Sequence, residues 1–404
     1  MQNKVKFILR LAVFVICAGA AVGCFLPDDA RPYALGLPRV SPILSFLGAL
    51  AARRVAGWLC LAGVPLLVLA VFKSRWFCWH LCPMGFAAEM AGRLHPGPSK
   101  LLARIPNLNK ILFLLLAVSA AVGYPIFVWL DPLCIFNGFF TAWREPFAWT
   151  SALTGAGFVL ILLASLAVPN IWCHRLCPLG GLQELLGKPF QNLKRKVAAG
   201  SSKAPAKAAG VDRRTFVGLA AGGLAAVAGR AVTGREKPDA IRPPSAVRVD
   251  FNAVCARCGN CMRACPKALI QPDVGLTGLD GLLTPIVRYR HLAPDQEEYC
   301  FQDCTACTQV CPTGALHPIT VEQKHALPMG LAVVDKAKCI AWADKQYCVV
   351  CQEYCPYQAV IEVERNGVMC PEIDPKKCRG CGACESACPA DPIAIIVKNQ
   401  RSAQ

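Results

Sequence analysis

The chain has 404 residues and a formal net charge of +17, and 54% of its residues are hydrophobic. A mean hydropathy of +0.40 excludes an ordinary soluble ferredoxin, and the apolar residues are concentrated in about the first 175 positions. The excess of Lys and Arg does not indicate a nucleic-acid-binding protein, because no recognition module accompanies it. It favours contact with the anionic headgroups of a lipid bilayer.

Four apolar windows in the first half reach the roughly 20 residues that a helix needs to cross a bilayer. They cover residues 7–26, 55–72, 111–130 and 153–172. Lys and Arg are enriched before the first window and after the second and fourth, which places those segments on the cytoplasmic side. The pattern predicts that residues 1–187 form an all-α transmembrane bundle of four helices.

The second and fourth windows are each followed by a C-x-x-x-C-P motif. The two copies are Cys78-Trp79-His80-Leu81-Cys82-Pro83 and Cys173-His174-Arg175-Leu176-Cys177-Pro178. Residues four apart share one face of a helix, so the two motifs together could present four thiolates, enough for one further iron–sulfur cluster. Plain or redox-active thiols remain an alternative. A haem between His80 and His174 is disfavoured, because both histidines lie at the edge of the predicted membrane domain.

A segment of different composition joins the two halves. Residues 188–210 form a basic linker, expected on the cytoplasmic side, and Arg213-Arg214 then precede a weakly apolar stretch that resembles a twin-arginine export signal. Over residues 211–230 this segment is either a signal cleaved after Ala228, which would yield two polypeptides, or a fifth membrane anchor. In both cases residues 231–404 are expected to be an exported domain.

The last third repeats a bacterial ferredoxin pattern four times, with three closely spaced cysteines and a fourth followed by proline. The sixteen cysteines, motif by motif, are Cys255, Cys258, Cys261, Cys265; Cys300, Cys304, Cys307, Cys311; Cys339, Cys348, Cys351, Cys355; and Cys378, Cys381, Cys384, Cys388. Zinc ribbons lack the third cysteine and the Cys-Pro ending, and no disulfide scheme shows such a repeat. The motifs therefore predict four [4Fe-4S] clusters.

The fourth cysteine of such a motif usually ligates the partner cluster, so the clusters are expected in pairs. Either neighbouring motifs pair, or the first pairs with the fourth around the second and third. A short apolar run follows each Cys-Pro, at residues 268–270, 315–316, 359–363 and 393–397. Each run is expected to form a strand, which makes residues 231–404 an α+β ferredoxin-like domain that holds two bis-[4Fe-4S] modules.

The first half, with its duplicated C-x-x-x-C-P motif, resembles the NapH type of membrane quinol dehydrogenase. The second half, with its four cluster motifs, resembles the NapG and MauM ferredoxin-type proteins, so the chain looks like a fusion of the two. It departs from the NapH pattern in one respect. Proteins of that type carry two cytoplasmic ferredoxin motifs after their last helix, whereas residues 179–210 contain no cysteine.

The resemblance implies that quinol is oxidised at the membrane and that electrons reach an exported redox enzyme or cytochrome through the clusters. His80, Glu89 and His174 are candidates for the quinone site, although each could equally be a solvated interface residue. The expected location is the bacterial inner membrane, with the ferredoxin domain on the periplasmic side. Two alternatives are a maturation factor that reduces metal or thiols for a respiratory complex, and an anchor subunit that returns electrons to the quinone pool.

Overall fold

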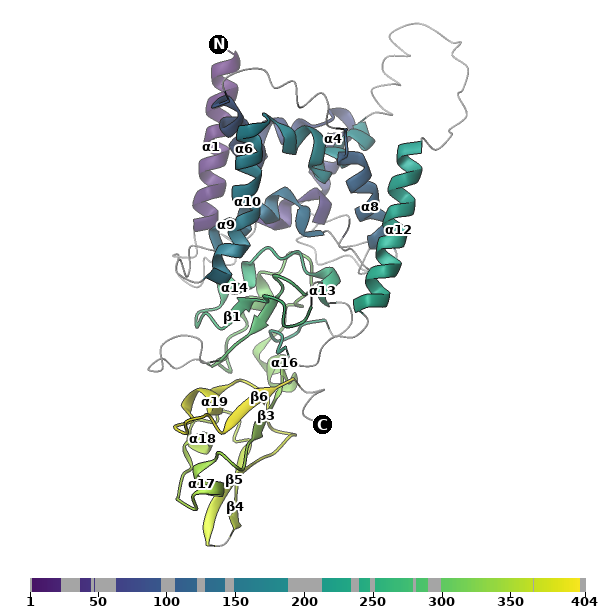
Figure 1. Cartoon of the computed structure of the whole chain (residues 1–404). Coiled ribbons are helices and arrows are strands. Elements are labelled where there is room, and N and C mark those ends of the chain that lie inside the picture. Colours follow the sequence, from purple (N-terminus) through teal and green to yellow (C-terminus); the bar gives the residue numbers. More distant parts are fainter. Residues whose placement is uncertain are drawn as a thin grey trace, which may run out of the picture. The chain divides into compact units, whose positions relative to one another are not determined.

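The computed structural model describes residues 2–22, 37–44, 47, 63–95, 106–121, 128–141, 149–187, 213–233, 240–247, 251–278, 281–289, 299–365 and 367–399. The chain divides into two compact units (Figure 1). The first comprises Met1–Gly234, Val249–Asn260 and Pro312–Ala315, and the second comprises Arg235–Arg248, Cys261–Cys311 and Leu316–Gln404. The predicted linker at residues 188–210 lies outside the described residues.

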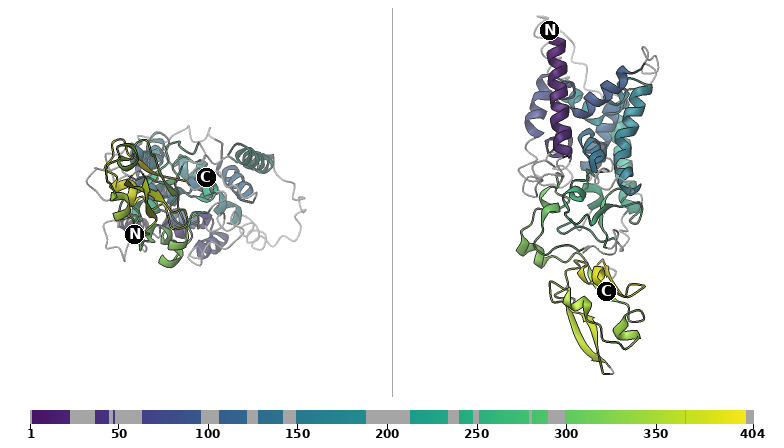
Figure 2. Two further views of the ribbon diagram at one scale, coloured as in Figure 1. Left: turned by 90° about the horizontal axis from the view of Figure 1, so that it is seen from below. Right: turned by 90° about the vertical axis from the view of Figure 1, so that its left-hand side faces the viewer.

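The first unit is built from helices. Those described are α1 (Gln2–Val22), η2 (Leu37–Val40), α4 (Val64–Phe72), α5 (Trp76–His80), α6 (Pro83–Arg93), α8 (Asn109–Ala121), η4 (Val128–Leu130), α9 (Pro132–Thr141), α10 (Trp149–Ala167), η5 (Trp172–Leu176), α12 (Arg213–Thr233) and α13 (Phe251–Val254). In Figure 2 the purple α1 stands beside the blue and teal helices of its own unit.

Local sequence explains where several of these helices begin. Pro83 occupies the first turn of α6, where a missing N–H costs nothing, and the Cys82 sulfur accepts a hydrogen bond from the Gly85 N–H at 3.4 Å. Asp131 precedes α9, and its Oδ2 accepts from the backbone N–H of Leu133, at 3.1 Å. In both C-x-x-x-C-P motifs a short helix ends just before the second cysteine: α5 ends at His80, ahead of Cys82, and η5 ends at Leu176, ahead of Cys177.

The core of the first unit is aromatic. Phe136 of α9 has no exposed surface, and its ring lies 5.2 to 5.8 Å from those of Phe14, Phe140 and Phe158. Offset and edge-on ring pairs of this kind add about 0.5–1.5 kcal/mol each to the gain from burial. They join α1, α9 and α10 into one packed body.

Helix α12 packs against α8 through glycine, and the two run side by side in Figure 1. A Cβ on Gly222 would lie 2.9 Å from both the Cα and the carbonyl oxygen of Leu115, and one on Gly218 would lie 3.3 Å from Leu114 Cβ. Glycines four apart let two helix backbones approach closely. The segment that resembles an export signal is therefore a packed helix of the first unit, and α12 continues past Ala228 to Thr233.

The prediction of a four-helix transmembrane bundle is wrong. Within the described residues, only the segment Lys4–Val22 of α1 is long and apolar enough to cross a membrane, and α12, the proposed fifth anchor, does not qualify. Two apolar helices, Asn109–Ala121 and Ala152–Ala167, are shorter, and at about 1.5 Å per residue neither reaches the roughly 30 Å of a bilayer core. The windows were identified by their apolar residues, and some of these residues, such as Phe113 and Phe158, are buried inside the first unit.

The second unit consists of short helices and three antiparallel strand pairs, β1–β2, β3–β6 and β4–β5. Its elements are α14 (Asn260–Ala264, which starts at the boundary), β1 (Ile270–Pro272), β2 (Pro285–Val287), α15 (Ala306–Gln309), α16 (Val321–Ala326), β3 (Leu331–Val334), α17 (Ile340–Ala343), α18 (Val350–Glu353), β4 (Val360–Arg365), β5 (Val368–Ile373), α19 (Ala383–Ala387) and β6 (Ile395–Lys398).

The strands expected after the Cys-Pro pairs are confirmed for three motifs, as β1, β4 and β6. The run after the second motif, residues 315–316, contributes only an isolated bridge between Leu316 and Ala246. The pair β3–β6 aligns Leu331 with Lys398, and the hairpin β4–β5 aligns Val360 with Ile373. The third cysteine of each ferredoxin motif lies in a short helix: Cys261 in α14, Cys307 in α15, Cys351 in α18 and Cys384 in α19.

Candidate functional site

The third and fourth ferredoxin motifs exchange their last cysteines. Cys388 lines one cavity together with the first three cysteines of the third motif, Cys339, Cys348 and Cys351. Burial, together with the other three cysteines, raises the pKa of the Cys351 thiol to about 12. A second cavity reverses the arrangement, because Cys355 of the third motif lines it with Cys378, Cys381 and Cys384.

The first and second motifs show half of the same exchange. Burial raises the pKa of the Cys307 thiol, and Cys300, Cys265 and Cys304 raise it further, so Cys265 lies beside the second motif. Neighbouring motifs are therefore paired, and the alternative of first with fourth does not fit. The remaining set is divided between the units, with Cys255 and Cys258 in the first and Cys261 and Cys311 in the second. Its assignment to one cluster stays a prediction from spacing.

Backbone donors point at several of these sulfurs. The Ala359 N–H donates to Cys355 Sγ at 3.3 Å, and the Leu316 N–H donates to Cys311 Sγ at 3.4 Å. Such hydrogen bonds stabilise thiolate ligands and adjust the reduction potential of a bound cluster. No three His, Cys, Asp or Glu side chains among the described residues converge on a position that suits a single ion. The residues fit a wider cubane better than a zinc ion bound at about 2.3 Å.

A direct contact within the second unit links the second and fourth ferredoxin motifs. The backbone N–H of Cys300, in the second motif, donates to the carbonyl oxygen of Cys381, in the fourth motif, at 2.8 Å. Beside this contact, the hydroxyl of buried Tyr289 donates to the Gly380 carbonyl at 2.6 Å. Gly382 has φ +84°, and a Cβ there would overlap the Tyr289 ring. The second and fourth motifs are thus held together by the backbone of their own ligand loops.

The four cysteines of the C-x-x-x-C-P motifs form a group in the first unit. Burial raises the pKa of the Cys82 thiol, and Cys78, Cys173 and Cys177 raise it further. The Gln183 side chain donates to Cys78 Sγ at 3.3 Å. The structure therefore brings together the two motifs, whose equivalent cysteines are 95 positions apart and whose pairing the sequence could only suggest.

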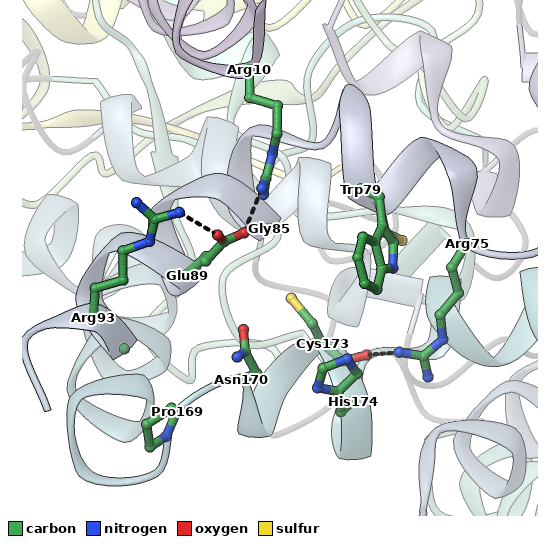
Figure 3. A pocket seen from close by; sticks show the side chains of 12 residues that line it. Arg10, Arg75, Trp79, Gly85, Glu89, Arg93, Pro169, Asn170, Cys173 and His174 are labelled. Carbon is green, nitrogen blue, oxygen red and sulfur yellow. Dashed lines mark hydrogen bonds and ion pairs between the residues drawn. The ribbon is translucent and has the colours of Figure 1, made fainter. Parts of the chain in front are cut away.

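A cavity of about 370 Å³ adjoins this four-cysteine group (Figure 3). Its wall includes Cys78 and Cys173, and it is also lined by Arg10, Arg75, Trp79, Gly85, Glu89, Gly92, Arg93, Pro169, Asn170 and His174. A volume of this size suits a small organic ligand.

Charged side chains organise the cavity. The Glu89 carboxylate accepts hydrogen bonds from Arg10 and from Arg93 (Figure 3). Burial alone would raise the pKa of Glu89, but the two guanidinium groups outweigh it and lower the pKa. On the opposite side Arg75 donates to the Cys173 carbonyl at 3.2 Å and pairs with Glu184. Arg75 thereby connects the segments that carry the two C-x-x-x-C-P motifs.

Of the three residues predicted for a quinone site, two line the cavity and one does not. Glu89 and His174 both line the cavity. His80 does not line it; its ring stacks on Trp76 with centroids 4.9 Å apart, and its Nδ1 lies 2.9 Å from the Trp76 carbonyl oxygen. Sequence reasoning did not single out Arg75, because no motif marks an arginine that acts through tertiary contacts.

Comparisons with known proteins find 4Fe-4S binding domains in both halves of the chain. A family model described as a 4Fe-4S binding domain matches residues 55–102 and 150–197, and a second model with the same description matches residues 371–394. The first model covers both C-x-x-x-C-P motifs. No solved structure matches. These matches define a 4Fe-4S-binding protein of the ferredoxin type.

Three curated relatives are ferredoxin-type proteins and show which family within this class the chain resembles. The ferredoxin-type protein MauM of Methylophilus methylotrophus is 33% identical over 46% of this chain and 83% of its own length. NapG of Escherichia coli is 34% identical over 46% of this chain and 80% of its own length. NapF of Escherichia coli is 30% identical over 39% of this chain and 86% of its own length. The chain belongs to the family of ferredoxin-type 4Fe-4S electron-transfer proteins that contains MauM and NapG.

Proposed function

We propose that the chain takes electrons from a quinol and delivers them through [4Fe-4S] clusters to an exported oxidoreductase or cytochrome. One observation carries the proposal. The cavity in the first unit is lined both by two cysteines of the four-cysteine group, Cys78 and Cys173, and by two polar groups, Glu89 and His174. A quinol headgroup in that cavity would lie directly against the residues that we assign to a cluster.

The cluster assignment has two parts. The sixteen ferredoxin cysteines hold four [4Fe-4S] clusters, and Cys78, Cys82, Cys173 and Cys177 hold one more. The fifth assignment is supported by the burial of the group, by donors such as Gly85 and Gln183 that face its sulfurs, and by the 4Fe-4S family match over both motifs. When bound, a cluster of this kind accepts and releases single electrons.

Oxidation of a quinol releases two protons with its two electrons, so the cavity needs a proton acceptor. The Glu89 carboxylate is held by two guanidinium groups, which makes it a weak base. His174 is the better candidate: its side chain lines the same cavity, and burial together with Arg75 and Arg175 lowers its pKa, which favours a neutral ring whose free nitrogen can accept a proton. Arg10, Arg75 and Arg93 would orient the oxygens of the headgroup.

We also propose that the first half plays the role of a NapH-type quinol dehydrogenase, attached to the bacterial inner membrane, while the ferredoxin half faces the periplasm. Helix α1 supports the attachment, since Lys4–Val22 has the length and apolarity to enter a bilayer. The resemblance of Arg213-Arg214 to a twin-arginine signal supports export of the ferredoxin half. Protease treatment of intact spheroplasts tests the orientation: digestion of the ferredoxin half is expected, and full protection would contradict export.

The function is tested by anaerobic reduction in lipid. A menaquinol analogue is added to the purified protein, and cluster reduction is followed by EPR with iron counted on the same sample. We expect about 20 irons per chain and rapid reduction by quinol. The double variant Cys78→Ser/Cys177→Ser should retain about 16 irons and reduction by dithionite but lose reduction by quinol. Cys370→Ser serves as the control, because Cys370 is buried outside the predicted ligand set.

Two results would contradict the proposal. Clusters of the unaltered protein that stay oxidised with quinol but reduce with dithionite would favour a maturation factor or the return of electrons to the quinone pool. Unchanged quinol kinetics in the double variant would exclude the C-x-x-x-C-P cysteines from the electron path. His174→Gln should slow quinol-driven reduction without loss of iron, and an unchanged rate would remove His174 as the proton acceptor.

A further inference from the structure

Lys324 is buried beside one predicted cluster site. It lies in α16 and is only 3% exposed, although lysine is almost never fully buried in proteins unless it is paired. Its Nζ donates to Cys300 Sγ at 3.3 Å, to the Cys304 carbonyl at 2.7 Å and to the Phe301 carbonyl. All three partners belong to the first turn of the second ferredoxin motif.

This contact accounts for the unusual spacing of that motif. Cys300 and Cys304 are separated by three residues, where the first and fourth motifs have two. The longer loop presents the Phe301 and Cys304 carbonyl groups to α16, and both need a donor there. The Lys324 ammonium supplies both. Its position is fixed by the capping box at the start of α16, formed by Thr320 and Gln323.

The same ammonium lies beside the electron-accepting site. Its Nζ lies 3.3 Å from Cys300 Sγ and 2.7 Å from the Cys304 carbonyl oxygen, so its charge directly faces the loop that carries two of the four cysteines of the set. Reduction of a cluster adds one negative charge to its surroundings, and a buried cation stabilises that charge much more than an exposed one does. Net charge and hydrogen bonds to sulfur are the main protein terms in cluster potential.

We propose that Lys324 is a positioning residue that raises the reduction potential of the cluster held by Cys300, Cys304, Cys307 and Cys265. The inference rests on the proposed assignment of a [4Fe-4S] cluster to this set. Because Cys300 also donates a backbone hydrogen bond to Cys381 of the fourth motif, this cluster borders the second cluster pair. Lys324 thereby makes it a preferred position for the electron at the junction between the pairs.

The test compares Lys324→Gln, which keeps a donor and removes the charge, with Lys338→Gln. Lys338 immediately precedes the ligand Cys339 but is 42% exposed and paired with Asp335, so it controls for proximity in the sequence. Midpoint potentials are measured by EPR-monitored redox titration, and the signal is assigned with a Cys304→Ser variant that lacks the cluster. We expect Lys324→Gln to lower the reduced-to-oxidised ratio of this cluster at least about tenfold, equivalent to 59 mV for a one-electron couple.

Each outcome decides the proposal. An unmoved midpoint in Lys324→Gln at full iron content would overturn it, as would an equal shift in Lys338→Gln. If Lys324→Gln loses four irons, Lys324→Arg decides: a bound cluster at the original midpoint supports the role of the charge, and loss of iron from both variants would leave Lys324 a packing role only. Iron counts on the unaltered chain separate this failure from failure of the cluster assignment, which would show no cluster in this set, and the midpoint measurement does not depend on whether quinol is the electron donor.

Discussion

Gly222 of α12 tests whether the segment that resembles an export signal is a permanent part of the fold. A Cβ on Gly222 would lie 2.9 Å from Leu115 Cα, whereas a Cβ on the adjacent Gly223 would meet only Val118 Cγ1, at 3.9 Å. Both Gly→Ala substitutions gain about 1 kcal/mol of helix propensity. Gly222→Ala also overpacks the contact with α8, which costs about 1–3 kcal/mol. The two variants should therefore differ by about 1–3 kcal/mol in the stability of α12.

Hydrogen exchange of the α12 amides, followed by mass spectrometry on the intact chain, measures this difference as a local opening free energy. We expect the amides of Gly222→Ala to exchange about 5 to 150 times faster than those of Gly223→Ala, since about 1.4 kcal/mol corresponds to a factor of ten. Equal exchange in the two variants would refute the packing argument. A purified product whose ferredoxin half begins after Ala228 would refute the retention of α12.

Three further predictions follow from single contacts. Gly382→Ala should lose about four irons per chain, because its Cβ would overlap the Tyr289 ring, whereas Gly367→Ala, at a similar φ of +82° but in open space, should keep them; iron analysis distinguishes the two. Asn137→Leu removes the hydrogen bonds that Asn137 donates to the Cys258 carbonyl and to the Asn260 side chain, at about 0.5–1.5 kcal/mol each, and should speed loss of iron to a chelator; unchanged release would contradict this. Arg75→Met should slow reduction by quinol but not by dithionite, and equal slowing with both donors would point to a general folding defect.

The local features of the ferredoxin half were predictable from the sequence. Cysteine spacing and the Cys-Pro ending indicated the ligand loops, and the apolar runs indicated strands that the structure confirms as β1, β4 and β6. These features depend on residues only a few positions apart. Lys324 could not be found in this way, because it acts on a loop more than 15 residues away and no spacing rule connects the two.

The prediction from the apolar windows, in contrast, was wrong. Each window has the composition of a membrane helix, but composition does not distinguish a side chain that faces lipid from one that packs against another helix. The close approach of α12 to α8, and the burial of Phe113 and Phe158, depend on partners far away in the chain. For this reason the sequence overestimated the number of crossings.

The sequence by itself determined the chemistry of this protein, because four-cysteine motifs carry their ligands within a single turn or loop and sulfur ligation requires little else. The tertiary structure alone decided which motifs exchange cysteines, that Cys78 and Cys173 line a cavity shared with Glu89 and His174, and that Lys324 lies against Cys300. Those relations are set by packing between segments that are distant in the chain, and a local pattern of residues does not reveal which distant segments pack together.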